Sequence, residues 1–338
     1  MKILQPKDIK DDLIRLWETG GQKCYPVGYK CMHGHYGMVE ASCTDWTGFP
    51  VSGKTEVMFD FLMNMSQLHN WRHLMFVPDA GTKEKVIAML IHKYCGKTFK
   101  KTWIDGSGNE HENQNFISKD EMMRYQLPVM DAFKFLVPEV KNGRTEKITP
   151  YKFWDFAAEN RMELKLNTAV IDSWKDLKHD YSGGGYATYL EEVLPYRNSL
   201  AEESGLHFHT VIHPKSPQRL KDGKYPVPTE HDLKGGSEWF NSGKSMIVIH
   251  RETKTTPTTD IYVKKAKPEE VGRAGDVVSL NYDVATRRFY EYSADGREKL
   301  FARDYTSEPA QEKILKPLQP NVDFTTSNRE EEEDTMPF

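Results

Sequence analysis

The sequence of 338 residues has little cysteine, no long apolar run and no excess of basic charge. Its few cysteines are irregularly spaced and suit no disulfide framework, which indicates a reducing compartment. They are Cys24, Cys31, Cys43 and Cys95. The spacing of the first two relative to His33 and His35 matches no familiar pair of zinc ligands.

Apolar segments are short throughout the chain. The longest run, Val86 to Ile91, is far shorter than a membrane span requires, and the first residues, MKILQPKD, lack the apolar core of a secretory signal. We therefore expect a soluble, intracellular protein with no membrane partner. The net charge of −4 means that the chain lacks the overall basic charge typical of proteins that bind nucleic acid. This is weak evidence, because a ring or channel that holds nucleic acid needs only a local basic lining.

What the sequence does contain is a phosphate-loop motif. The segment TGFPVSGKT (47–55) matches G-x-x-x-x-G-K-[ST], between a predicted strand at Val39–Cys43 and a helical pattern. Backbone N–H groups of such a loop hold phosphates at the positive end of the helix. We expect Lys54 to reach the β- and γ-phosphates of ATP or another nucleoside triphosphate, and Thr55 to bind Mg²⁺. The predicted nucleotide-binding residues are Gly48, Pro50, Ser52, Gly53, Lys54 and Thr55.

Further strands are predicted to alternate with helices, which indicates a parallel sheet covered by helices. They lie at residues 73–77, 169–171, 207–212 and 245–249. The polar residues that follow them are Asp79, Asp172, His213 and Arg251. Because ligands bind at the carboxyl ends of parallel strands, these side chains predict one site. Two more strands, 277–282 and 287–292, are predicted as an antiparallel pair that completes the domain.

The order of these motifs resembles the RecA-like motor domain of DnaB-type replicative helicases, and most of all the Twinkle-like and phage primase-helicase branch. The segments that carry the resemblance are TGFPVSGKT (47–55), FVPDAGTKEKVIAMLIHKYCGKTF (76–99), AVIDSW (169–174), HTVIHPKSP (209–217), LKGGSEWFNSGKSMIVIHRE (233–252) and TDIYVKKAKPEEVGRAGDVVSLNYDVATRRFYE (259–291). The resemblance implies an α/β fold: a RecA-like P-loop NTPase core with a mostly parallel sheet and C-terminal antiparallel strands. It divides the chain into a linker helix (1–24), an ATPase domain (25–310) and an acidic tail (311–338).

The resemblance also implies catalytic roles for the residues at the strand ends. Asp172 would be the second carboxylate on the magnesium side, His213 a γ-phosphate sensor, and Arg251 an arginine finger that reaches the next subunit's nucleotide. A turn that ends the strand is the alternative role for Asp172. The family places a glutamate at the position of Asp79, and aspartate is one methylene shorter. Asp79 is therefore either a general base acting on a shifted water or a residue that only begins a helix.

Members of this family form hexameric rings around single-stranded DNA. The chain is thus expected to be an ATP-dependent DNA helicase or translocase of DNA replication, in the cytoplasm of a bacterium or a virus-infected bacterium. No primase-like module precedes the motor, so a separate protein is expected to prime the DNA. Basic side chains would hold phosphates and a tryptophan would stack on a base, although a solvated basic loop is the alternative. The predicted DNA-binding residues are Lys215, Arg219, Lys221, Lys234, Trp239 and Lys244.

Both ends of the chain have features of interaction segments. Residues 7–19 predict an amphipathic helix that packs on its own core or on a neighbouring subunit. Residues 320–338 are acidic, poor in apolar side chains and predicted to be disordered. They end in Met336, Pro337 and Phe338, as the tails of bacterial single-stranded-DNA-binding proteins end in Pro-Phe, which implies a replisome partner; a solubilising tail is the alternative.

Two other functions are compatible with the same motifs. One is a RecA-like recombinase that forms filaments on DNA. The other is a nucleotide-gated DNA-binding scaffold or loader with weak ATPase activity, which the aspartate at position 79 favours.

Overall fold

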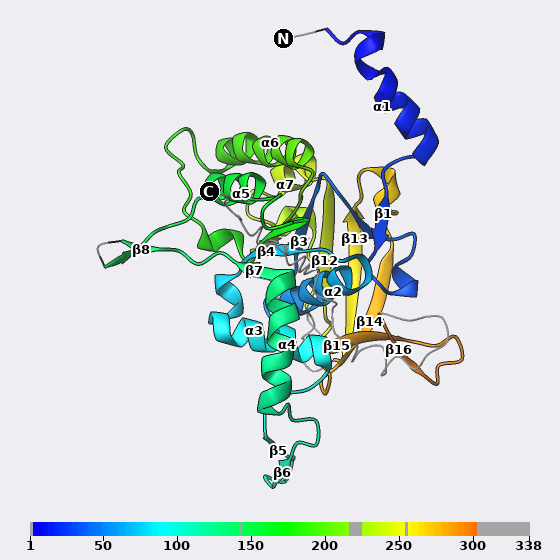
Figure 1. Cartoon of the computed structure of the whole chain (residues 1–338), viewed down its shortest axis with the longest axis vertical. Helices are drawn as coiled ribbons and strands as arrows, with labels where there is room; N and C mark the ends of the chain where they lie inside the picture. The colour runs from blue at the N-terminus through cyan, green and yellow to red at the C-terminus, as the bar shows by residue number, and fades with distance from the viewer. Residues whose placement is uncertain (1–2, 142, 216–224, 254–255, 303–338) are drawn as a thin grey trace, which may run out of the picture.

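The computed structural model describes residues 3–141, 143–215, 225–253 and 256–302. A ten-stranded sheet with the order β16-β15-β14-β13-β12-β3-β11-β10-β4-β7 runs through it (Figure 1). The six strands from β12 to β7 are parallel, and β12 to β16 pair antiparallel. The strands are β3 (Ser42–Thr47), β4 (His73–Phe76), β7 (Phe133–Phe135), β10 (Thr168–Ile171), β11 (His207–Ile212), β12 (Ser245–His250), β13 (Thr258–Lys265), β14 (Val277–Asp283), β15 (Arg288–Tyr292) and β16 (Lys299–Phe301). The predicted fold class is confirmed.

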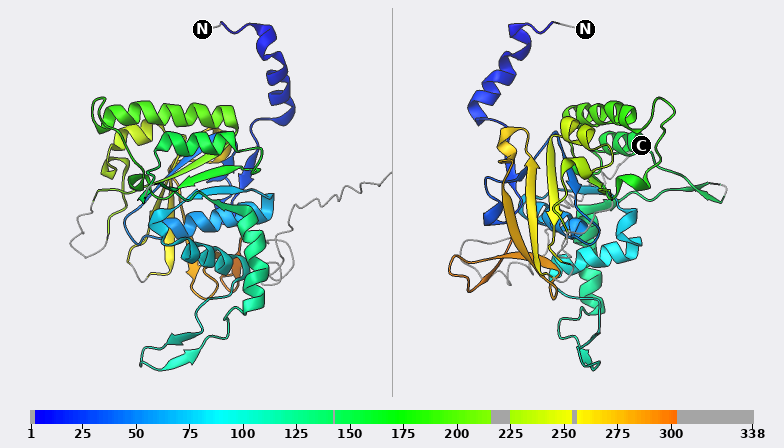
Figure 2. Two further views of the ribbon diagram at one scale, coloured as in Figure 1. Left: turned by 60° about the vertical axis from the view of Figure 1, so that its left-hand side comes forward. Right: turned by 180° about the vertical axis from the view of Figure 1, so that it is seen from behind.

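Helices cover both faces of the sheet and bury a separate apolar core on each side (Figures 1 and 2). One face carries α2 (Lys54–His69), α3 (Lys83–Cys95) and α4 (Lys119–Ala132). The other carries α5 (Pro150–Glu159), α6 (Tyr186–Ser204) and α7 (Gly236–Ser242). Three short hairpins lie outside the main sheet: β1 (Cys24–Pro26) with β2 (Gly37–Val39), β5 (Thr102–Ile104) with β6 (Glu110–Glu112), and β8 (Val140–Lys141) with β9 (Arg144–Thr145).

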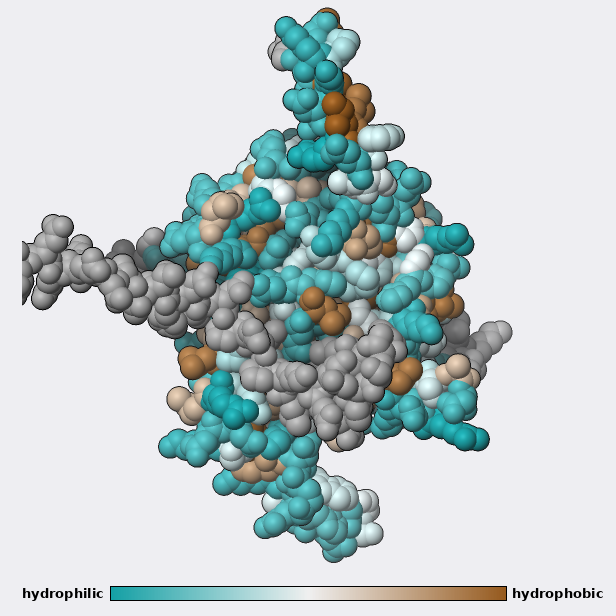
Figure 3. Space-filling model, turned by 45° about the vertical axis from the view of Figure 1, so that its right-hand side comes forward, coloured by the Kyte–Doolittle hydropathy of each residue, from teal (hydrophilic) through white to brown (hydrophobic). Residues whose placement is uncertain are grey.

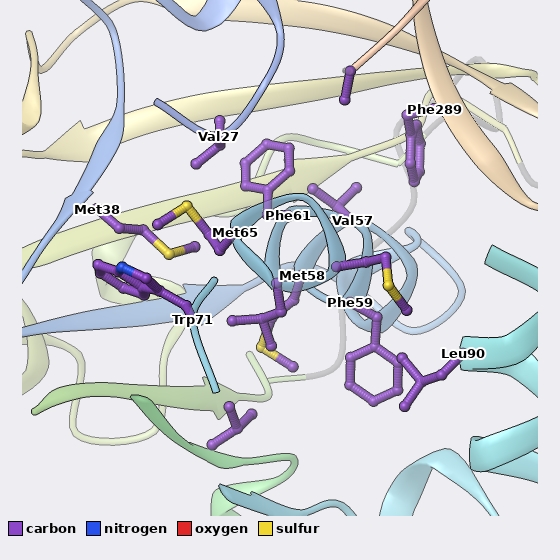
Figure 4. Close-up of a cluster of buried hydrophobic side chains, with 14 of the residues drawn as sticks. Val27, Met38, Val57, Met58, Phe59, Phe61, Met65, Trp71, Leu90 and Phe289 are labelled. Carbon is purple, nitrogen blue, oxygen red and sulfur yellow. The ribbon is translucent and has the colours of Figure 1, made fainter. Parts of the chain in front are cut away.

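The helix that follows the phosphate loop is buried on most of its circumference. Figure 4 shows Val57 and Phe61 on one side of α2 and Phe59 on the opposite side, each among packed side chains. The buried residues of α2 include Asp60, Asn64 and Ser66 besides apolar ones, so nearly every side of the helix faces the protein interior. The first turn of α2, which receives the phosphates in such loops, is therefore held by the core of the protein.

Three predicted elements are wrong in detail. The sequence pattern predicts two helices between the second and third strands, at 118–125 and 128–135. The structure has the single helix α4 there, and residues 133–135 form strand β7 instead of a helix end. Proline removes one helical hydrogen bond, but Tyr125 and Val129 are buried on either side of Pro128, so packing sustains the helix. The strand before the phosphate loop lies at 42–47 rather than 39–43. Its polar residues are all buried, so a pattern of apolar residues in the sequence does not assign them to the strand.

The N-terminal helix α1 (Pro6–Thr19) forms where it was predicted, and none of its residues is buried. It stands apart from the body of the molecule (Figures 1 and 2), with an apolar side open to solvent (Figure 3). Trp17 is 84% exposed. A helix that packs on its own core is thus not what the structure shows.

No helix among the described residues is both long and apolar enough to cross a membrane. The acidic tail, with Met336, Pro337 and Phe338, lies outside the described residues.

Candidate nucleotide site

The phosphate loop joins the end of β3 to the start of α2, as its motif predicts. Gly53 has φ +93°, a left-handed conformation that glycine adopts without strain, and the helix begins at the next residue. Lys54 is buried, and its Nζ donates hydrogen bonds to the carbonyl oxygens of Gly48 (2.7 Å) and Phe49 (3.0 Å). Burial lowers the pKa of Lys54 to about 8. This ammonium has little water around it and gains from an anionic ligand.

Asp172 lies directly behind the first turn of α2, at the end of β10. Its Oδ2 accepts a hydrogen bond of 2.6 Å from the Thr55 hydroxyl, so the two predicted magnesium ligands meet. Burial raises the pKa of Asp172 to about 6, while Thr55 and Lys54 oppose the shift. A buried carboxylate beside a hydroxyl is a suitable donor pair for Mg²⁺, which binds oxygen.

Ser52 gives the loop a further polar group. Its Oγ is buried and has no hydrogen-bond partner within the described part of the chain. Such a group is costly unless a ligand or water completes it. Ser52, Lys54, Thr55 and Asp172 thus fit a nucleotide with its metal ion.

Asp79 lies beside this group, in the 3₁₀ turn η2 (Pro78–Ala80) after β4. Its backbone N–H donates to the carbonyl oxygen of Asp172 (3.3 Å), and its Oδ2 is 3.2 Å from Nε2 of His213. Its Oδ1 accepts a hydrogen bond of 2.8 Å from Nζ of Lys175, in the 3₁₀ turn η3 (Trp174–Asp176). Sequence reasoning missed Lys175, because its contact with Asp79 joins two turns that lie 96 residues apart in sequence.

The charges of this group affect one another. Burial would raise the pKa of Asp79, but Lys175 and then His213 outweigh it, and the net shift is downward. Burial lowers the pKa of His213, and the charges of Lys54 and Lys175 lower it further. At neutral pH, a neutral imidazole and an ionised carboxylate therefore lie at the end of the phosphate loop.

Arg251 follows β12 and lines a small pocket beside its own phosphate loop, together with Pro50 and Val51. Its Nε donates to Oγ1 of Thr259 (3.0 Å), and its guanidinium lies 5.8 Å from the centre of the Tyr282 ring. In this chain, then, Arg251 is held by its own sheet.

The predicted DNA-binding residues fall into different surroundings. Trp239 is 0% exposed and packs edge-on against Trp174, so the prediction that it stacks on a base is wrong: α7 directs it into the core. Lys244 forms an ion pair with Glu202 (2.9 Å), and Lys234 lies over the ring of Tyr186. Lys215 is exposed at the end of the described segment. Arg219 and Lys221 lie outside the described residues.

No group of three or more His, Cys, Asp or Glu side chains that could hold a metal ion occurs among the described residues. This holds for the cysteines and histidines near the N-terminus too. A nucleotide-bound Mg²⁺ needs no such group, because phosphates and water supply most of its ligands.

Comparisons with known proteins bear on the fold of the chain. No protein-family model matches the chain. The Twinkle homolog protein, chloroplastic/mitochondrial, of Arabidopsis thaliana is 23% identical over 290 residues, which are 83% of this chain and 38% of that relative. The chain thus spans little more than a third of the length of this curated relative.

Two solved structures share the fold. One, the structure of an ATPase domain, matches with a TM-score of 0.62 and 14% identity, over 83% of this chain and 97% of that one. A DnaB-like replicative helicase, determined in a study of its interactions with primase, matches with a TM-score of 0.59 and 13% identity, over 86% and 67%. The predicted resemblance is thereby confirmed at the level of fold: the chain shares the fold of these two structures and is similar in sequence to a Twinkle homolog.

Proposed function

We propose that this chain is the motor of an ATP-driven DNA translocase, a replicative helicase that acts on single-stranded DNA in the cytoplasm. One observation carries the proposal: Lys54, Thr55 and Asp172 converge at the carboxyl ends of parallel strands, next to a second carboxylate at Asp79. Phosphoryl transfer needs positioned positive charge, metal ligands and an acceptor for the proton of water, and these groups can supply each of them.

Each side chain has a distinct task in this mechanism. Lys54 would leave the carbonyl oxygens of Gly48 and Phe49 and neutralise phosphate charge. Thr55 and Asp172 would hold Mg²⁺, which supplies positive charge at the β- and γ-phosphates. Asp79 would orient the attacking water and accept its proton. His213, which follows strand β11, would contact the γ-phosphate and so sense whether it is present.

The active form is proposed to be a ring, a hexamer by analogy, with nucleotide between subunits. Arg251 would act in trans after leaving Thr259, and the exposed apolar side of α1 would pack on the neighbouring subunit. Single-stranded DNA would pass through the middle, held by Lys215 and Lys234, with Arg219 and Lys221 on the same segment of chain. Trp239 is left out because it is buried.

ATPase assays with and without oligo-dT test this function. Wild type should show hydrolysis that DNA stimulates, and Lys54→Ala should lose at least about a hundredfold in kcat because the phosphate charge is left uncompensated. Arg251→Ala should be equally impaired, and mixing it with Lys54→Ala should restore activity only if the arginine acts across subunits. Hydrolysis in the pure Arg251→Ala assembly at the wild-type rate would refute the trans role.

The loader or scaffold is the second candidate, favoured by the ion pair that occupies Asp79. It predicts binding of nucleotide and DNA with hydrolysis too slow to drive unwinding. A recombinase, in contrast, would coat DNA as a filament. Negative-stain images with an ATP analogue and oligo-dT, together with an unwinding assay on a forked duplex, distinguish all three.

The terminal Met336, Pro337 and Phe338 are proposed to bind a replisome protein. An apolar pocket with a basic rim would accept the Phe338 ring. Deleting the three residues should weaken capture of the partner without lowering ATP hydrolysis, whereas replacing Thr325 with Ala should affect neither. Equal capture of partners by the truncated chain would exclude this contact.

A further inference from the structure

Both carboxylate oxygens of Asp79 are engaged. Oδ1 lies 2.8 Å from the ammonium of Lys175, and Oδ2 lies 3.2 Å from the His213 imidazole. A carboxylate paired with an ammonium is a weak proton acceptor, because taking up a proton would abolish the attraction. In this arrangement Asp79 is therefore unsuited to the role of general base.

The backbone of Lys175 is held in place, whereas its side chain is largely exposed to solvent. The turn η3 that carries it is held by the Ser173 hydroxyl, which donates to Oδ2 of Asp176 (2.8 Å), and by the buried Trp174. The side chain itself is 55% exposed and has a flexible four-carbon stem. It can therefore exchange partners without disturbing the fold.

The ammonium of Lys175 lies close to the groups of the nucleotide site, because it is 2.8 Å from Asp79 Oδ1. Burial is the main reason that the pKa values of Lys54 and His213 are lowered, and the charge of Lys175 adds to both shifts. Hydrogen bonds link the two sides: Lys175 pairs with Asp79, whose backbone N–H donates to the Asp172 carbonyl oxygen. The Asp172 side chain accepts from Thr55, the residue after Lys54. A γ-phosphate placed there carries more charge than one carboxylate and offers more acceptor oxygens.

We propose that Lys175 is a nucleotide-dependent clamp on Asp79: it holds the carboxylate in the free chain and transfers to the γ-phosphate when a triphosphate binds. The inference rests on the proposed function and adds regulation to the same site. Once released, Asp79 orients water. The water oxygen bonds to the γ-phosphorus, the bond from that phosphorus to the β–γ bridging oxygen breaks, and the proton passes through Asp79 to the departing inorganic phosphate.

The clamp differs from an ordinary surface ion pair in what it predicts. An exposed pair contributes only about 0–1 kcal/mol to stability and has no preference between nucleotides. A clamp that transfers to the γ-phosphate must distinguish a triphosphate from a diphosphate. The discrimination between the two is therefore the decisive measurement.

The test uses the full chain and the variants Lys175→Met and Lys175→Arg, with Lys178→Met as the matched control on an exposed lysine of the same segment. Equilibrium binding of ADP and of a non-hydrolysable ATP analogue is measured with Mg²⁺. We expect Lys175→Met to weaken binding of the analogue about tenfold, the loss of roughly one charged contact, and to leave ADP binding unchanged. With ATP and oligo-dT, its kcat should fall by about tenfold or more.

Lys175→Arg should restore most of both properties, and the control should match wild type. Equal losses for the analogue and ADP, or no loss for either, would overturn the clamp. These outcomes are independent of the proposed function: if wild type lacks DNA-stimulated hydrolysis, the helicase proposal fails, while the ratio of the two affinities still decides whether Lys175 contacts the γ-phosphate.

Discussion

Two buried aspartates in one sheet have opposite surroundings. Asp45, in the middle of β3, receives hydrogen bonds from both terminal nitrogens of Arg197, at 2.6 and 3.1 Å, and both side chains are fully buried. Asp172, at the end of β10, is as deeply buried, but within the described residues its side chain accepts one hydrogen bond, from Thr55. Burial alone therefore does not distinguish a structural carboxylate from a functional one.

The difference lies in whether the chain itself supplies the compensating charge. Asp45 has its cation built in, as a stable fold requires of a buried charge. Among the described residues, Asp172 has no cation in direct contact. Burial raises the pKa of both carboxyl groups, so the arginine pairing of Asp45, and not the direction of the pKa shift, separates the two. We infer that Mg²⁺ supplies the positive charge that the Asp172 carboxylate lacks. The same distinction, between a group whose partner lies in the chain and one whose partner is a ligand or another subunit, can be tested by substitution.

Removing the built-in cation should have the largest effect on stability. Arg197→Met leaves the Asp45 carboxylate buried without its partner, and we expect the free energy of unfolding to fall by about 3–5 kcal/mol. Urea denaturation measures it. The control is Glu202→Gln, which breaks the surface pair with Lys244 and should cost about 0–1 kcal/mol. Similar losses in the free energy of unfolding for both variants would show that the buried Asp45–Arg197 pair matters no more to stability than the surface pair.

Removing the charge of Asp172 should have the opposite sign. Its folded pKa of about 6 exceeds the ordinary value of 3.8, so its contribution to stability is complete below pH 3.8 and is lost as the pH rises through 6. Without Mg²⁺ or nucleotide, Asp172→Asn should therefore be more stable than wild type at about pH 7.5, by up to about 3 kcal/mol, with little gain at about pH 4.

Urea denaturation at the two pH values checks this prediction. Addition of Mg²⁺ with ADP should stabilise wild type and reduce the difference, because only the carboxylate gains a ligand. A variant that is less stable than wild type at the higher pH would contradict it.

The sequence predicted the carboxyl-end site because strand patterns and a phosphate loop are local signals. Asp172, His213 and Thr55 needed only their places in the chain order to be brought together. The partner of Asp79 was not predictable in this way, because Lys175 reaches it across two turns 96 residues apart in sequence. Burial was the other failure: Trp239 lies in a loop-like sequence, and only tertiary packing shows that its ring belongs to the core.

A strained residue in the phosphate loop extends the comparison to the backbone. Val51 has φ +69°, a left-handed conformation that is unfavourable for a β-branched side chain. Such strain costs about 1–3 kcal/mol, and glycine would relieve it at an entropic cost of about 0.5–1 kcal/mol. We expect Val51→Gly to raise the free energy of unfolding by about 1 kcal/mol. Thermal denaturation tests this prediction. The control is Val284→Gly, at an exposed turn residue without positive φ, which should lower the stability because glycine relieves no strain there.

The exposed face of α1 should contribute least to the stability of the single chain and most to contacts beyond it. No residue of α1 is buried, so Trp17→Ala should change the free energy of unfolding of the isolated subunit by less than about 0.5 kcal/mol. In the presence of an ATP analogue, the same substitution should shift the assembly toward smaller species, measured by sedimentation velocity. Trp103→Ala, on the exposed hairpin β5–β6, is the matched control and should leave the assembly intact. If Trp17→Ala assembles like wild type, then α1 does not pack on a neighbouring subunit. The contact between subunits proposed for this chain would then be limited to the nucleotide site.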